Sequence, residues 1–391
     1  MLAGNPTVPS RSGNARPMQI TSNTTGMLAE LSVFTDKDAR DHCVVVVKGT
    51  FQTNARGELR LAVEQRPLVT ADEHHGDPAT TSVRYECDFA PEKPLTDVIV
   101  VGNAIAPGGE PVQKLSVVLE VRGRRKELVV HGHRRWVNVI GALSPSDPVA
   151  FTEMPLTFDR AWGGQDDSRG ATKVEVEARN LVGVGFHPHR SSRLVAGQPV
   201  PNIEAPDDHV TSPRGRHAPA GFGCVGRAWM PRVSFAGTYD ETWRQERAPF
   251  LPRDFDSRYF QCAPADQQFP HFEGGETIRC FHMAKEPMVE YVIPDGPPPI
   301  RFRFVDGEVE RIGVLDTVTL EPHLGLAMLA YRASVPLRKK LTALREITVG
   351  TPPAVNQPAV DGIRGYRNGK PVFRGLAPTL RWLRQRRGGE R

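Results

Sequence analysis

The sequence between residues 44 and 63, VVVVKGTFQTNARGELRLAV, decides the fold class. Two runs rich in apolar residues, Val44–Phe51 and Leu59–Val63, flank Asn54–Gly57, a short connection that ends in glycine. β-Branched residues favour extended backbone, and a short glycine-containing connection is typical of a β-hairpin. We therefore expect two antiparallel strands here.

Similar runs occur on both sides of a middle region rich in loops. Strand-forming residues recur at 96–106, 114–121, 127–130, 300–305, 308–312, 315–320, 324–335 and 344–349. The dipeptide Asp306-Gly307 joins two of these runs and is a strong hairpin signal. Residues 324–331 could also form a turn or two of helix, because Leu, Ala and Met favour helices. The sequence predicts a mainly β protein with antiparallel, sandwich-like sheets, little helix and long ordered loops rich in Pro and Gly.

The length suggests more than one subdomain, because single hydrophobic cores stop growing near about 250–300 residues and this chain has 391. The middle region, about 145–300, contains many prolines and few regular strands, and its aromatic residues should pin its loops in an ordered arrangement. The predicted segments are a flexible leader at 1–20, a β-rich N-terminal subdomain at 21–145, a loop-rich β subdomain at 146–350, and a Pro-rich linker with a basic tail at 351–391.

Composition and charge argue against several classes of protein. Hydrophobic residues make up 39% and charged residues 24%, as in ordinary globular proteins. No apolar run approaches the ~20 residues of a membrane helix, and the first twenty residues lack the apolar segment of a secretory signal. We expect a cytoplasmic protein without membrane contact.

Six arginines between residues 374 and 391 suit an acidic partner. Nucleic acid is less favoured, because this run is short and the net charge is only +5.

Sequence patterns of common enzymes are missing. The chain has no Gly-x-Ser-x-Gly, His-Glu-x-x-His or Walker sequence. Residues Gly221–Gly226 match the dinucleotide-binding fingerprint, but prolines on both sides remove the strand and the helix that this motif requires. His131 and His133 would lie on one face of a strand, without a third metal ligand at usable spacing. We predict no enzyme, no cofactor and no stoichiometric metal.

Many ordered strings of residues between about 20 and 335 resemble one family, a domain of unknown function found beside type VI secretion genes. They include Tyr85–Phe89, Gly102–Ala104, Met154–Gly164, Pro201–Glu204, Trp229–Arg232, Gly237–Asp240, Leu251–Asp256 and Arg258–Phe260. The chain departs from the family at His133, where members often have an acid, and at Leu181, where they often have proline. The resemblance implies an adaptor or chaperone that brings an effector together with a PAAR or other spike-tip protein. It carries over no catalytic residue.

Twelve residues in these strings are candidate fold or interaction positions. Glycine permits turns, Asp caps them, Arg pairs with carboxylates, and aromatic side chains anchor loops. The twelve are Arg160, Trp162, Gly163, Gly164, Trp229, Arg232, Tyr239, Asp240, Trp243, Asp254, Asp256 and Arg258. Asp254 and Asp256 are expected to serve the fold, because Arg253 and Arg258 offer pairing partners.

The function expected from these observations is that of a binding protein. It would bind an effector and help to load it onto the VgrG/PAAR spike complex, without a small-molecule substrate. Two other classes stay open. One is a hydrolase that uses a metal ion or carboxylates. The other is a β module that binds carbohydrate through Trp162, Trp229 and Trp243.

Overall fold

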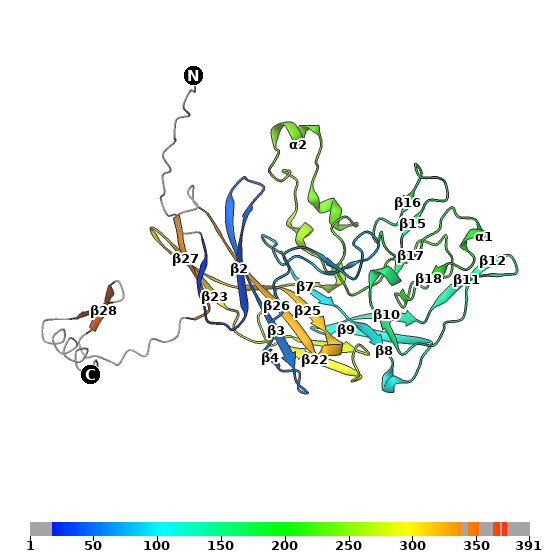
Figure 1. Ribbon diagram of the computed structural model, residues 1–391, viewed down its shortest axis with the longest axis horizontal. Helices are drawn as coiled ribbons and strands as arrows, with labels where there is room; N and C mark the ends of the chain where they lie inside the picture. Colours follow the sequence, from blue (N-terminus) through cyan, green and yellow to red (C-terminus); the bar gives the residue numbers. More distant parts are fainter. Residues whose placement is uncertain (1–17, 338–342, 352–362, 368–369, 374–391) are drawn as a thin grey trace, which may run out of the picture. The chain divides into compact units, whose positions relative to one another are not determined.

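The computed structural model describes residues 18–337, 343–351, 363–367 and 370–373. The predicted mainly β fold is confirmed, because the described elements are mostly strands in antiparallel sheets (Figure 1). Described residues up to Gly350 belong to one compact unit, and those after it to a second. Most of the predicted leader and of the predicted linker and tail, including residues 374–391, lies outside the described residues.

The largest sheet in the described part of the chain has seven strands. Its order is β2 (Leu28–Thr35), β3 (Asp41–Thr53), β26 (Leu326–Pro336), β25 (Val314–Glu321), β7 (Thr96–Val100) and β20 (Gln268–Phe269), with β4 (Leu59–Leu61) also paired to β3. The hairpin predicted from residues 44–63 is confirmed as β3 and β4, with Phe51 opposite Leu61. The alternative left open at 324–331 is resolved as a strand, because β26 pairs with β3 along its whole length.

A second sheet combines two predicted strands with strands of the middle region that the sequence did not predict. Its order is β19 (Ile203–Glu204), β10 (Arg124–His131), β9 (Lys114–Val121), β21 (Thr277–Phe281) and β22 (Met288–Val292). The sequence did not predict β21 and β22, which are only five residues long. They are strands because β21 pairs with the distant β9 and turns Ile278 and Cys280 into the core.

The remaining strands form smaller sheets. The hairpin predicted at Asp306-Gly307 is confirmed, since β24 begins at Gly307 and pairs with β23. One sheet has the four strands β1 (Ile20–Asn23), β27 (Leu344–Val349), β23 (Pro299–Phe304) and β24 (Gly307–Ile312), and another has the three strands β12 (Ala142–Pro145), β11 (Arg134–Val139) and β18 (Pro199–Val200). The two-stranded sheets are β8 (Asn103–Ile105) with β13 (Glu153–Pro155), β14 (Trp162–Gly163) with β17 (Val184–Gly185), β15 (Gln165–Asp166) with β16 (Glu175–Val176), and β5 (Glu73–His74) with β6 (Val83–Tyr85). In the second unit, β28 (Ile363–Arg367) pairs with β29 (Lys370–Phe373).

The described helices are short and connect these strands. They are α1 (Ser192–Val195), α2 (Glu241–Glu246) and the 3₁₀ turns η1 (Pro107–Gly109), η2 (Phe158–Arg160), η3 (Arg232–Ala236), η4 (Ser257–Phe260), η5 (Ala265–Gln267) and η6 (Pro322–Leu324). None of the helices in the described ranges has the length and apolar character needed to cross a membrane.

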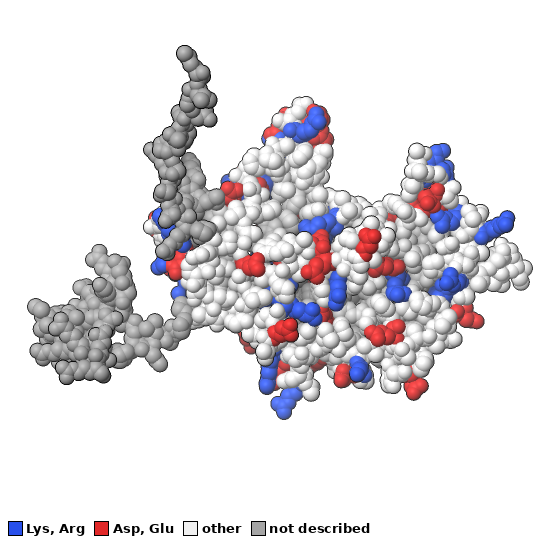
Figure 2. All heavy atoms as spheres, in the orientation of Figure 1, with Lys and Arg blue, Asp and Glu red and all other residues white. Residues whose placement is uncertain are grey.

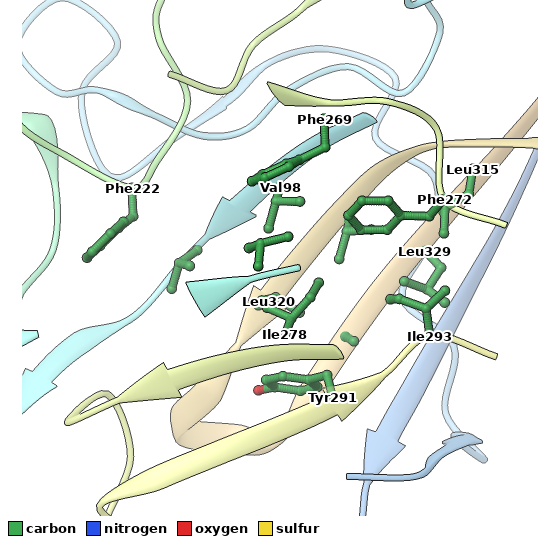
Figure 3. Packing of buried hydrophobic residues seen from close by; sticks show 14 of the residues in the cluster. Val98, Phe222, Phe269, Phe272, Ile278, Tyr291, Ile293, Leu315, Leu320 and Leu329 are labelled. Carbon is green, nitrogen blue, oxygen red and sulfur yellow. The ribbon is translucent and has the colours of Figure 1, made fainter. Parts of the chain in front are cut away.

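The main hydrophobic core combines side chains of the two largest sheets (Figure 3). Val98 and Leu320 come from the seven-stranded sheet, and Ile278 and Tyr291 come from the second sheet. These strands lie on both sides of residue 145, where the sequence suggested a boundary between subdomains. The β3 strand is buried on both faces, because its side chains alternate between two clusters. Val45 and Val47 enter the main core, and Val44 and Val46 enter a smaller cluster on the other face.

Candidate interaction surface

The twelve residues predicted as fold or interaction positions lie in two groups. Arg160, Trp162, Gly163 and Gly164 lie on or beside η2 and β14. The other eight lie between residues 229 and 258, a segment that we call the arm; Figure 1 draws its helix α2 at the end of an extension from the sheets. The two groups meet where the rings of Phe158 and Trp229 pack edge to face, 5.6 Å apart.

In the first group, Trp162, Gly163 and Gly164 are buried where two chain segments cross, and Arg160 is half-buried. Trp162 is 1% exposed and belongs to a small core cluster. A Cβ atom on Gly163 would lie 2.3 Å from the carbonyl oxygen of Asn180, and one on Gly164 would lie 2.5 Å from that of Gly183. Asn180 Nδ2 donates to the carbonyl oxygen of Trp162 at 3.0 Å. Only glycine fits this close approach of two backbones.

Arg232 anchors the base of the arm. It is 3% exposed, and its guanidinium forms a two-point ion pair with Glu86. It also donates to the carbonyl oxygens of Tyr259 at 2.7 Å and Val225 at 2.8 Å. Burial disfavours the charged form of Arg232, but the hydrogen-bonded Glu86 outweighs this and raises its pKa. Sequence inspection could not identify Glu86 as the partner, because the two residues are far apart in the chain.

Short-range hydrogen bonds fix the rest of the arm. Asp240 accepts from the backbone N–H of Trp243 at 2.8 Å and so caps α2, and the ring of Tyr239 lies 4.7 Å from that of Trp243. Asp254 accepts from the backbone N–H and the hydroxyl of Thr238, which ties the two ends of the α2 loop together. These contacts hold the arm in one shape although it contributes little to the main core.

Asp256 and Arg258 complete the base of the arm. Asp256 caps η4 by accepting from the backbone N–H of Arg258 at 2.9 Å, and it pairs with the Arg258 guanidinium at 2.6 Å. This hydrogen-bonded arginine lowers the pKa of Asp256. Arg258 also lies over the ring of Phe235, 4.2 Å from its centre.

Several apolar side chains are exposed along the arm. Met230, Val233 and Phe250 are each 40% exposed, and Tyr239 is 52% exposed. Figure 2 shows charged side chains of both signs at the tip of the extension and mostly uncharged surface below them. Exposed apolar side chains of this kind are available for contact with another protein.

A groove of about 640 Å³ lies beside the base of the arm. Two of its basic side chains already have acidic partners: Lys126 lies 2.8 Å from Asp266, and Arg179 lies 2.7 Å from Glu177. Its apolar lining comes from Leu128, Phe158, Val225, Met230, Pro231 and Phe235. The groove therefore offers apolar contacts framed by charged pairs.

The predicted histidine pair needs a correction. His131 and His133 do not lie together on one strand face, because β10 ends at His131 and β11 begins at Arg134. Gly132 lies between them, and its backbone approaches Val149 so closely that a Cβ atom on residue 132 would lie 1.7 Å from the carbonyl oxygen of Val149. His131 is buried and His133 is exposed. Two residues that sequence spacing did not connect, Glu204 and His209, lie beside His131 instead.

The fold and the arm define a β-sheet protein with an ordered, projecting loop segment. The sequence from residue 38 to residue 332 matches the model of the family DUF2169, described as an uncharacterized protein conserved in bacteria. This match spans most of the chain, and the chain belongs to that family. Comparison with curated proteins and with solved structures finds no match.

Proposed function

We propose that this protein is a cytoplasmic adaptor that binds a type VI secretion effector and helps to load it onto the VgrG/PAAR spike complex. The choice of partner rests on the resemblance described above. The structural observation that supports a binding role is the arm, where Met230, Val233, Tyr239 and Phe250 are 40–52% exposed. Met230 also lines the groove. An effector would place apolar side chains against the arm and enter the groove.

The contacts of the candidate residues favour binding over catalysis at this surface. Arg232, Asp240 and Asp254 each make hydrogen bonds that hold the arm in shape. Such residues preserve a binding surface, since a rigid loop loses less conformational entropy when a partner docks. Carbohydrate binding is less favoured, because Trp162 and Trp229 are only 1% and 6% exposed and cannot present a ring face to a sugar.

Co-purification with the proposed partners tests this function. The protein is co-expressed with the effector and the spike-tip protein encoded beside it, and the complex is isolated through a tag on the effector. We expect the double variant Tyr239→Ser/Phe250→Ser to reduce recovery at least about tenfold, because truncating central apolar contacts commonly costs more than 1 kcal/mol.

A matched control removes exposed apolar side chains elsewhere. Val139 and Ile140 are 51% and 102% exposed at the tip of the β11–β12 hairpin. The variant Val139→Ser/Ile140→Ser should keep full recovery. Failure of the unchanged protein to bind either partner would refute the adaptor function. Equal recovery of both double variants would refute the role of the arm.

A further inference from the structure

We infer that His131, Glu204 and His209 form a zinc-binding site. The ligand atoms of these three residues all lie within 4.8 Å of one another. Two imidazoles and one carboxylate are a ligand set that zinc uses when a fourth position is left for water or another ligand. The inference is independent of the proposed adaptor function.

The fold brings the three side chains together from two chain segments. β10 and β19 are antiparallel, and Val129 lies opposite Glu204. His131 is two residues beyond Val129, so its side chain lies on the same face of the sheet as that of Glu204. After β19 the chain turns back at Ala205–Asp208, where the two end residues form a β-bridge, and this turn returns His209 to Glu204.

The two contacts of Glu204 Oε2 with the histidines are close to the spacing of neighbouring ligands around zinc, and the contact with His209 is also within hydrogen-bonding distance. Glu204 Oε2 lies 3.3 Å from His131 Nε2 and 3.2 Å from His209 Nδ1. Tetrahedral zinc with bonds of about 2.0–2.1 Å has ligands about 3.3–3.4 Å apart. Hydrogen bonds between charged groups are about 2.7–2.9 Å. His209 is half exposed and can move to complete the coordination.

The unsatisfied state of His131 is the second observation. This residue is 8% exposed. Within the described part of the chain its Nδ1 makes no hydrogen bond, and its Nε2 has only the 3.3 Å ion-pair contact with Glu204. A buried imidazole without a hydrogen bond is costly, whereas a metal ion would use the nitrogen that faces Glu204. The histidine is therefore better explained as a ligand than as a packing residue.

Arg134 defines which ions the site can take. It is buried and donates to Glu204 Oε1, the carboxylate oxygen that faces away from the histidines. Hydrogen bonding of a ligating carboxylate from behind is a common feature of metal sites and fixes its orientation. The positive charge of Arg134 also opposes cation binding. This disfavours Ca²⁺ and Mg²⁺, which gain little from imidazole, and favours Zn²⁺, for which imidazole is a strong ligand.

Metal titration of the full chain tests the inference. The protein is stripped with a chelator, dialysed, and titrated with Zn²⁺ by calorimetry. Co²⁺ then serves as a probe, because its visible spectrum reports ligand geometry. We expect about one zinc ion per chain, and cobalt bands typical of a tetrahedral site. The His209→Ala variant should lose both signals and still fold, since His209 is half exposed.

The His133→Ala variant is the matched control, because His133 is two residues from His131 and exposed. It should bind zinc as the unchanged protein does. Glu204→Gln, which keeps the size of the side chain, should weaken binding at least about tenfold. A stripped protein that takes up no zinc would overturn the inference. Equal zinc binding by the unchanged protein and by His209→Ala would also overturn it.

Discussion

A charged pair in the seven-stranded sheet and the Asp256–Arg258 pair on the arm lie in different environments. The side chains of Arg332 and Asp316 in the sheet are 5% and 1% exposed. Those of Arg258 and Asp256 on the arm are 58% and 36% exposed. A buried charge has lost its hydration and depends on its partner, whereas an exposed charge keeps water as an alternative. The Arg332–Asp316 pair thus belongs to the fold, as does the buried pair of Arg232 and Glu86 at the base of the arm. The Asp256–Arg258 pair sets local shape.

The buried pairs gather on one face of the large sheet. Lys48 lies 2.8 Å from Asp88, and Lys93 lies 2.8 Å from Asp97 and also donates to the hydroxyl of Thr317. Burial disfavours the charge of Lys93, but Asp97 outweighs this and raises its pKa. Loops cover this face around a small cavity of about 130 Å³. The sheet therefore has one face in the main core and another that carries these charged pairs beside smaller apolar clusters.

Removing one partner of a buried pair should have the largest effect on stability. We expect Arg332→Ala to lower the free energy of unfolding by about 3–5 kcal/mol, because Asp316 would stay buried without a counter-charge. The carbonyl oxygens of Asp88 and Ala90, which accept from Arg332, would also lose their donor. Urea unfolding followed by circular dichroism measures the change.

The double variant Arg332→Met/Asp316→Leu sharpens this prediction. It removes both charges and keeps apolar volume, so it should be more stable than Arg332→Ala. A cost of less than about 1 kcal/mol for Arg332→Ala would show that water reaches Asp316 and that the two environments do not differ as described.

A smaller effect is expected for the caps of the arm. Asp256→Ala should cost about 1 kcal/mol, the usual value for a lost cap, because Asp256 holds the first turn of η4. Asp254→Ala should loosen the loop that carries α2, since Thr238 would lose both hydrogen bonds. Thermal unfolding measures the first effect, and hydrogen exchange of the arm measures the second. If both variants keep their stability and yet lose partner binding, these residues form a functional surface instead.

The sequence predicted the elements whose signals are local. The hairpins around Asn54–Gly57 and Asp306-Gly307 could be predicted because turn residues and strand-forming residues are adjacent. The strands β21 and β22 could not, since each is short and is stabilised by pairing that begins at the distant β9. The metal-ligand cluster was missed for the same reason, because His131 and Glu204 are neighbours only after β10 pairs with β19.

The arm shows a similar limit at the level of single residues. Arg232 and Arg258 both follow aromatic and proline-rich strings in the sequence, and nothing local distinguishes them. The structure buries Arg232 against Glu86 and leaves Arg258 largely exposed. Burial depends on segments far away in the chain, so their different roles could not be predicted from the sequence alone.

The smallest effect on stability is expected for Arg258, whose side chain is largely exposed. Arg258→Ala should leave the unfolding midpoint unchanged at about 0.15 M salt, because water and ions replace the guanidinium at Asp256. The cap on η4 stays, since Asp256 accepts from the backbone N–H of residue 258 and not only from its side chain. Arg258→Lys serves as the control, because it keeps the charge and loses the planar contact with Phe235. Thermal unfolding of both variants at low and at physiological salt decides the outcome. A marked loss of stability in Arg258→Ala at both salt concentrations would show that this exposed pair supports the fold as the buried pairs do. The distinction between buried and exposed pairs would then fail.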